Sequence, residues 1–154
     1  MRISKVLLTL TSCYVAYTWG ANDVANATAL VSTSGALSPF FASLVGGAGM
    51  FLGAVILGYR VAGNVGFKVT RLNPMMGMCA DLSTAVVIHL FTQLHMPVST
   101  THALVGAIMG VGAARGTNLV NFKMVRDIAL VWVITPVFTA VISFMIFYMV
   151  KSFF

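Results

Sequence analysis

The chain has 154 residues, of which 59% are hydrophobic and only 8% are charged. A soluble domain carries about 25% charged residues, so this chain has too few to cover a surface that faces water. A bilayer removes that need, and at about 20 residues per helical span the length allows roughly five spans with short loops and no separate soluble domain. We therefore predict an all-α integral membrane protein in which residues 1–154 form a single transmembrane domain.

The net charge of +6 comes from nine basic and three acidic residues. The basic residues are dispersed and lack a soluble scaffold, which excludes a nucleic-acid partner. Most of them gather at residues 2–5, 60–71 and 115–126, and such groups mark the cytoplasmic side of a membrane protein. We expect a multi-pass protein of the cell membrane with its N-terminus and the loops 60–71 and 115–127 in the cytoplasm.

The first apolar run, residues 6–34, contains one charged residue, Asp23. As a single helix it would be about 43 Å long, which exceeds the roughly 30 Å hydrocarbon core but is too short for two spans. The run therefore predicts a broken or strongly tilted helix, with the break near Gly20 and an outer turn at 35–39. A second span follows at 40–59, where Gly49 and Gly53 have the spacing that lets helices pack closely in lipid.

Pro97 separates the apolar run 72–94 from the shorter run 98–114. Proline prefers the first turn of a helix and discourages helix in the residue before it, so a new helix is expected to start here. The two runs form either two spans or a helical hairpin whose tip stays within membrane depth. Residues 128–150 give a final span interrupted by Pro136, which makes five crossings. A duplicate of an odd-numbered unit inserts with inverted topology, a common transporter architecture.

The first polar cluster in these apolar runs is Asn22, Asp23 and Asn26. A carboxylate at membrane depth costs about 2.5–3.5 kcal/mol, so Asp23 is expected to face a cavity, an ion or a partner. The two asparagines are four residues apart and share one helical face. Their oxygen ligands suit a hard cation such as sodium, whereas a proton would use Asp23 itself. The alternative is a polar cluster that only holds helices together.

The second cluster is the run of hydroxyls Ser99, Thr100 and Thr101, which falls in the opening turn of the helix after Pro97. Free backbone N–H groups and the positive end of the helix dipole lie there, and they bind phosphate or sulfate. Helix capping by one hydroxyl is the alternative. The neighbouring His102 is a candidate proton carrier or supporting residue, and Asp81 is a third acid, able to hold a second cation or pair with a basic group.

Cys13 and Cys79 lie in apolar runs without metal-ligand spacing, so we expect them to be small buried hydrophobic residues. No HExxH or GxSxG motif occurs in the sequence. The sequence therefore does not predict an enzyme.

The motifs GANDVANA (residues 20–27) and PVSTTHALVGA (residues 97–107) resemble the paired motifs of the inorganic phosphate transporter family, the sodium- or proton-coupled phosphate permeases. Each member of that family has two inverted halves, and this chain resembles one half, the C-terminal half more than the first. The resemblance implies that the first cluster takes part in cation coupling and that the three hydroxyls contribute to the oxyanion site. Asp81 stands where the family usually has glutamate.

The resemblance implies a secondary transporter of inorganic phosphate, with a sodium ion or proton as coupling ion and no other cofactor. The expected partners are phosphate, the coupling cation, the bilayer and a second transporter half, with a homo-oligomer as a further expectation. An antiparallel dimer is disfavoured because eight of the nine basic residues fall on one predicted side. The alternatives are a sulfate permease of the same family and a non-transporting membrane subunit.

Overall fold

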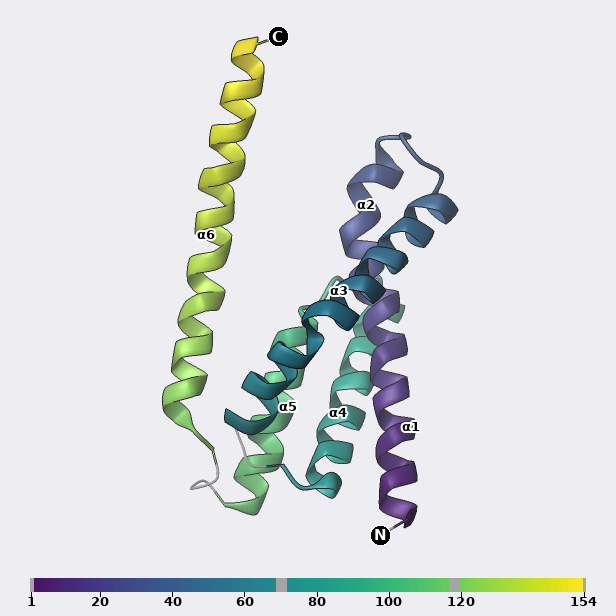
Figure 1. The fold of residues 1–154 in the computed structure, drawn as a ribbon, viewed down its shortest axis with the longest axis vertical. Helices are drawn as coiled ribbons and strands as arrows, with labels where there is room; N and C mark the ends of the chain where they lie inside the picture. The colour runs from purple at the N-terminus through teal and green to yellow at the C-terminus, as the bar shows by residue number, and fades with distance from the viewer. Residues whose placement is uncertain (1, 69–71, 117–119, 154) are drawn as a thin grey trace. The chain divides into compact units, whose positions relative to one another are not determined.

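The computed structural model describes residues 2–68, 72–116 and 120–153. The regular elements in these ranges are all helical, as predicted: α1 (Arg2–Trp19), the π-helical segment η1 (Gly20–Val24), α2 (Ala25–Thr33), α3 (Pro39–Lys68), α4 (Pro74–Gln93), α5 (Thr100–Arg115) and α6 (Phe122–Phe153) (Figure 1). They fall into two compact units, Met1–Val120 and Asn121–Phe154, so α6 forms a unit by itself.

The predicted break near Gly20 is confirmed and takes the form of η1. The helix that starts at Arg2 continues to Thr33, but over Gly20–Val24 it opens into the wider π-helical turn. A π-helical turn inserts an extra residue into the hydrogen-bonding ladder and is frequently found at functional sites. The segment holds Asn22 and Asp23, so the local distortion coincides with the first polar cluster.

α4 lies between α1, which runs parallel to it, and α5, which runs back beside it (Figure 1). α1 and α4 touch at Gly77, where an added Cβ would meet Leu8 Cδ1 at 3.4 Å, an ordinary van der Waals contact. The side chains buried by these three helices include Val15, Thr18, Met76, Ala80, Thr84, Ala85, Ile88, Val105 and Ile108.

Four of the described helices begin at a residue whose side chain accepts a hydrogen bond from the first turn. Ser38 Oγ accepts from Phe41 N at 3.5 Å at the start of α3. Asn73 Oδ1 accepts from Met76 N at 2.9 Å, with Pro74 at the first position of α4. Asn121 Oδ1 accepts from Met124 N at 3.1 Å at the start of α6. Ser99 has the same role for α5. These caps satisfy N–H groups that the helix leaves without a partner.

The close helix packing predicted at Gly49 and Gly53 occurs one turn earlier. A Cβ at Gly46 would clash with the side chain of Thr28, so α2 and α3 touch here, whereas Gly49 and Gly53 have open space around them. Glycine spacing showed that a close approach was present but not which glycine made it. The predicted burial of Cys13 and Cys79 is also wrong, because both cysteines are exposed.

Two of the predicted loops are partly helical. α3 continues to Lys68 and α6 begins at Phe122, so residues 60–68 and 122–127 are not loops; residues 69–71 and 117–119 lie outside the described ranges. Charged residues end a membrane span but need not end a helix, since lysine and arginine are good helix formers.

Pro136 does not interrupt α6, which runs unbroken from Phe122 to Phe153. Threonine hydroxyls bond to the carbonyls of the same turns: Thr135 to Val131 at 2.7 Å and Thr139 to Thr135 at 2.8 Å. Proline is tolerated in membrane helices where such side chains bond to the backbone. The predicted interruption is therefore wrong.

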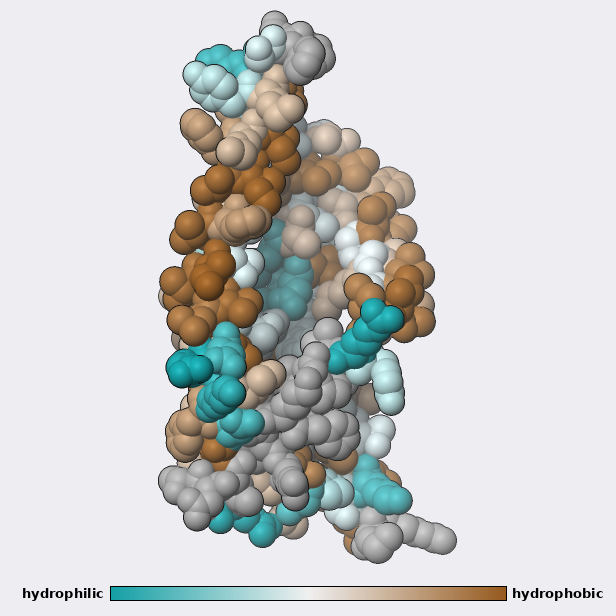
Figure 2. Space-filling model, turned by 60° about the vertical axis from the view of Figure 1, so that its left-hand side comes forward, coloured by the Kyte–Doolittle hydropathy of each residue, from teal (hydrophilic) through white to brown (hydrophobic). Residues whose placement is uncertain are grey.

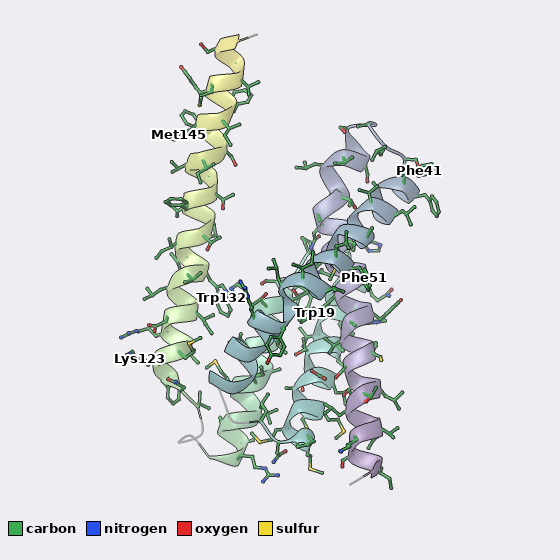
Figure 3. All side chains as sticks on the ribbon, in the orientation of Figure 1. Trp19, Phe41, Phe51, Lys123, Trp132 and Met145 are labelled. Atoms are coloured by element: carbon green, nitrogen blue, oxygen red, sulfur yellow. The ribbon has the colours of Figure 1, made fainter. Side chains whose placement is uncertain are left out.

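Three helical segments of the described chain are long and apolar enough to cross a membrane: Pro39–Arg60, Pro74–Gln93 and Phe122–Ser152. Large apolar side chains on α3 and α6 point outward, Phe41, Phe51 and Met145 among them (Figure 3). Figure 2 shows polar side chains at both ends of α6 and apolar ones along its middle. Soluble monomers rarely expose such continuous apolar faces, so these faces fit a multi-pass membrane protein.

Candidate functional site

The two polar motifs lie in contact, although more than 70 residues separate them in sequence. Asn22 Nδ2 donates to the backbone oxygen of Val98 at 2.8 Å, and Val98 N donates to Asn22 Oδ1 at 3.4 Å. Val98 lies in the extended segment before α5, where its backbone groups have no helical partner. The amide of Asn22, which is 4% exposed, supplies both missing bonds as a neighbouring peptide group would.

Asp23 is hydrogen bonded on both carboxylate oxygens. Asn22 Nδ2 donates to Oδ1 at 2.8 Å, and Thr100 Oγ1 donates to Oδ2 at 3.1 Å. The contact with Thr100 joins η1 directly to the first residue of α5, and Thr100 is only 9% exposed. The carboxylate of the first motif therefore holds a hydroxyl of the second.

The three consecutive hydroxyls have three different environments. Ser99 caps α5, because its Oγ accepts from His102 N at 3.4 Å, and it also lies 2.5 Å from His102 Nδ1. Thr100 is bound to Asp23. Thr101 is exposed, and its hydroxyl makes no hydrogen bond within the described residues. Ser99 therefore caps the helix, Thr100 binds the carboxylate of Asp23, and Thr101 has a hydroxyl that could bind a ligand.

A pocket of about 340 Å³ opens beside this contact, between η1 and the end of α4. Asn22 and Asn26 both line it, so the expectation that they share a face is met. The complete lining is Ala21, Asn22, Ala25, Asn26, Thr92, His95, Met96 and Pro97. The pocket is thus lined by the amides of Asn22 and Asn26 and the hydroxyl of Thr92, and the carboxylate of Asp23 is bonded to the amide of Asn22 beside it. Oxygen ligands of these kinds suit a hard cation.

Thr92 is a pocket residue that the sequence does not point to. Its Oγ1 is buried and has no hydrogen-bond partner within the described part of the chain, although a buried hydroxyl normally has one. The residue lines the pocket. A single threonine near the end of an apolar helix carries no signal of this kind in the sequence, since most such hydroxyls bond to their own helix.

The sequence also does not indicate that His95 ends a helix. It has a φ of 58°, and its N–H bonds to the oxygen of Thr92 at 3.0 Å while Met96 N bonds to Phe91 at 2.9 Å. This pair of bonds is the usual way to end a helix at a left-handed residue, a position that glycine normally fills. The turn ends α4 and directs the chain into Pro97 beside the pocket.

Asp81 is not brought to this site. It lies on α4, eleven residues before Thr92, which is about 16 Å along a helix. There it accepts a hydrogen bond of 2.6 Å from Ser12 Oγ on α1. Its suggested part in cation coupling therefore stays a prediction, and the contact observed is one that joins α1 to α4.

Comparison with known proteins gives consistent matches. Residues 1–143 match a family model described as the phosphate transporter family. The chain is 37% identical over 164 residues to a candidate phosphate permease of Chlamydia pneumoniae, covering 99% of this chain and 38% of the relative. It is 42% identical over 149 residues to one of Pyrococcus abyssi, covering 90% and 37%.

A solved structure, described as "The sodium-dependent phosphate transporter", is also similar. Its sequence identity is 40% and its TM-score is 0.72, and the match covers 86% of this chain and 36% of that one. The chain thus spans less than two fifths of the length of each of these relatives.

Proposed function

The chain belongs to the phosphate transporter family, and we propose that it forms part of a secondary transporter that moves inorganic phosphate together with a cation. The family is one of transporters, which agrees with the prediction that the chain is not an enzyme. The observation that carries the proposal is the hydrogen bond from Thr100 to Asp23. It joins the proposed cation site to the proposed anion site.

The proposed anion site is the first turn of α5. The N–H groups there have no partner within the helix, and the positive end of the helix dipole favours a negative charge. Thr101 adds an exposed hydroxyl without a bond in the described residues, and Ser99 and Thr100 lie directly before it. His102 supports this turn through its contact with Ser99.

The proposed cation site is formed by Asn22, Asp23 and Asn26. Asp23 supplies the negative charge, and the two asparagines that line the pocket supply neutral oxygens. Hard oxygen ligands suit sodium better than softer metals. We favour sodium over a proton as the coupling ion because the similar solved structure is described as that of a sodium-dependent transporter.

Thr100 gives the two sites a physical link. While its hydroxyl donates to Asp23 it has no hydrogen left for an anion, since a hydroxyl has one donor. A cation on Asp23 competes for the carboxylate oxygen and releases this hydroxyl toward phosphate. Linkage then requires that phosphate also raise the affinity for the cation by the same factor.

We further propose that the transporting unit includes a second half. The chain spans less than two fifths of the length of its relatives, and sites in transporters with inverted repeats lie where the two repeats meet. An assembly of several copies is compatible with this arrangement. The exposed position of Thr101 suits a site that another polypeptide segment completes.

The test is uptake of labelled phosphate by vesicles that contain this chain together with its second half. We expect uptake that needs an inward sodium gradient and, because the family is one of phosphate transporters, that unlabelled phosphate inhibits far more strongly than sulfate. Strong competition by sulfate would favour the sulfate permease, because hydroxyl and N–H donors alone do not distinguish two tetrahedral anions. Absence of uptake with both halves present would favour a non-transporting subunit.

A further inference from the structure

A second pocket, of about 310 Å³, lies at the far end of α4 from the candidate site, where α4 begins and α5 ends (Figure 1). Its lining is Met75, Met76, Cys79, Val111, Ala114 and Arg115. Nothing in the proposed transport of phosphate uses these residues. Five of the six are apolar or weakly polar, and the sixth is a cation in the last turn of α5.

Arg115 is exposed and makes no hydrogen bond or ion pair within the described residues. Arg126 differs in this respect, because it pairs with Asp127 at 3.1 Å. An arginine at a helix end interacts favourably with the helix dipole, but this leaves most of its five N–H donors free. The pocket therefore combines an apolar lining, which can hold a hydrocarbon chain, with the guanidinium of Arg115, which can bind a phosphate ester.

The place of this pocket in the fold fits the boundary of a bilayer. α4 is one of the segments long and apolar enough to cross a membrane, and it begins at Pro74. Met75 and Cys79 therefore lie in its first turns, near the level of the lipid headgroups. Arg115 ends the neighbouring antiparallel helix at the same level, and basic pockets between helices on the cytoplasmic side are a known way to hold anionic lipids.

We propose that this pocket binds an anionic phospholipid. The phosphate diester of the headgroup lies against Arg115, and one acyl chain lies along Met75, Cys79 and Val111. Free inorganic phosphate could also pair with Arg115, but it has no hydrocarbon chain to contact the apolar lining. The ligand is therefore a lipid and not the transported anion, and the proposal does not depend on the transport function.

The two native cysteines provide a reporter and its control. Cys79 lines the pocket, Cys13 does not, and both are exposed. The purified protein in neutral detergent is titrated with phosphatidylglycerol, phosphatidylcholine or inorganic phosphate. Alkylation of each cysteine by N-ethylmaleimide is then followed by mass spectrometry of the peptides.

We expect phosphatidylglycerol to slow alkylation of Cys79 and leave Cys13 unchanged, with half-protection at about fivefold lower lipid than for phosphatidylcholine. This ratio corresponds to about 1 kcal/mol for one basic residue at an anionic surface. Inorganic phosphate should protect neither cysteine. Arg115→Gln should abolish the difference between the two lipids, whereas Lys151→Gln, which removes an exposed cation from the last turn of α6, should preserve it.

Three results would overturn the proposal. Equal protection by both lipids in the parent protein would mean that the pocket only meets bulk hydrocarbon. A preference for phosphatidylglycerol that survives Arg115→Gln would place the charge recognition elsewhere. A Cys79 that does not react even without added lipid would mean that another protein segment covers the pocket.

Discussion

Thr100 Oγ1 donates a hydrogen bond to Asp23 Oδ2 at 3.1 Å, across 77 residues of sequence. The two residues belong to different motifs, and in the proposed function Asp23 belongs to the cation site and Thr100 to the anion site. A carboxylate at membrane depth attracts a cation, and a hydroxyl at a helix start attracts an anion. Under the proposed function, this contact couples a change at the cation site to a change at the anion site.

Removing the charge of Asp23 should remove ion coupling. In Asp23→Asn the side chain keeps its shape but loses the negative charge, so sodium-driven uptake of phosphate should fall at least tenfold while the protein still inserts in the membrane. Uptake in vesicles with and without a sodium gradient measures this effect. A folded variant that keeps the parent's dependence on sodium would show that Asp23 is only structural.

Thr101 should contribute only to the affinity for phosphate. Thr101→Val keeps the shape of the side chain and removes one hydrogen bond to a charged ligand, worth about 1.5–3 kcal/mol, or roughly 10- to 150-fold in the dissociation constant. Phosphate binding is measured by isothermal titration in the protein with its second half. Thr139→Val is the matched control, because its hydroxyl bonds within α6; equal affinities in both variants would remove Thr101 from the site.

Asn22 should be needed for stability as well as for binding. Asn22→Ala leaves the N–H and C=O of Val98, which are partly buried, without their partner. A fully buried unpaired group costs about 1–3 kcal/mol, so the loss here should lie toward the lower end of that range for each group. The melting temperature in detergent should fall clearly below that of Asn26→Ala, since Asn26 is exposed and makes no hydrogen bond within the described residues. Similar melting temperatures for the two variants would contradict the proposed bridge.

His95→Gly should stabilise the protein. The residue has a φ of 58°, which costs most side chains roughly 1–2 kcal/mol and costs glycine little. The two bonds that end α4 come from backbone groups, so they survive the substitution. The melting temperature should rise relative to the parent and to His95→Ala, and a fall would mean that the imidazole itself supports the turn.

The sequence predicted the broken first helix, a new helix just after Pro97 and the two polar clusters. These depend on local rules, namely the length of an apolar run, the effect of proline and the cost of a carboxylate in lipid. The run 98–114 placed the start of the new helix two residues too early, since α5 begins at Thr100. It did not predict that Asn22 bonds to the backbone of Val98, because a contact between distant segments leaves no periodic signal. The ends of α3 and α6 were misplaced because charge marks the edge of the membrane and not the end of a helix.

The different contacts of the three hydroxyls are also visible only in the structure. From the sequence alone, Ser99, Thr100 and Thr101 are three like donors at a helix start, with capping by one hydroxyl as the alternative. In the structure one of them caps the helix and another is held by Asp23. Adjacent residues at a helix start point in different directions, about 100° apart, so a run of like residues does not make a run of like contacts.

The most direct test of the account is the effect of sodium on phosphate affinity in Thr100→Val. Phosphate binding is titrated at low and high sodium, with ionic strength held constant by choline, in the protein with its second half. In the parent, sodium should raise phosphate affinity by about 5- to 150-fold, the usual range of coupling between two sites. In Thr100→Val phosphate should bind more weakly but with an affinity that sodium hardly changes, and a variant that keeps the parent's full response to sodium would contradict the link through Thr100.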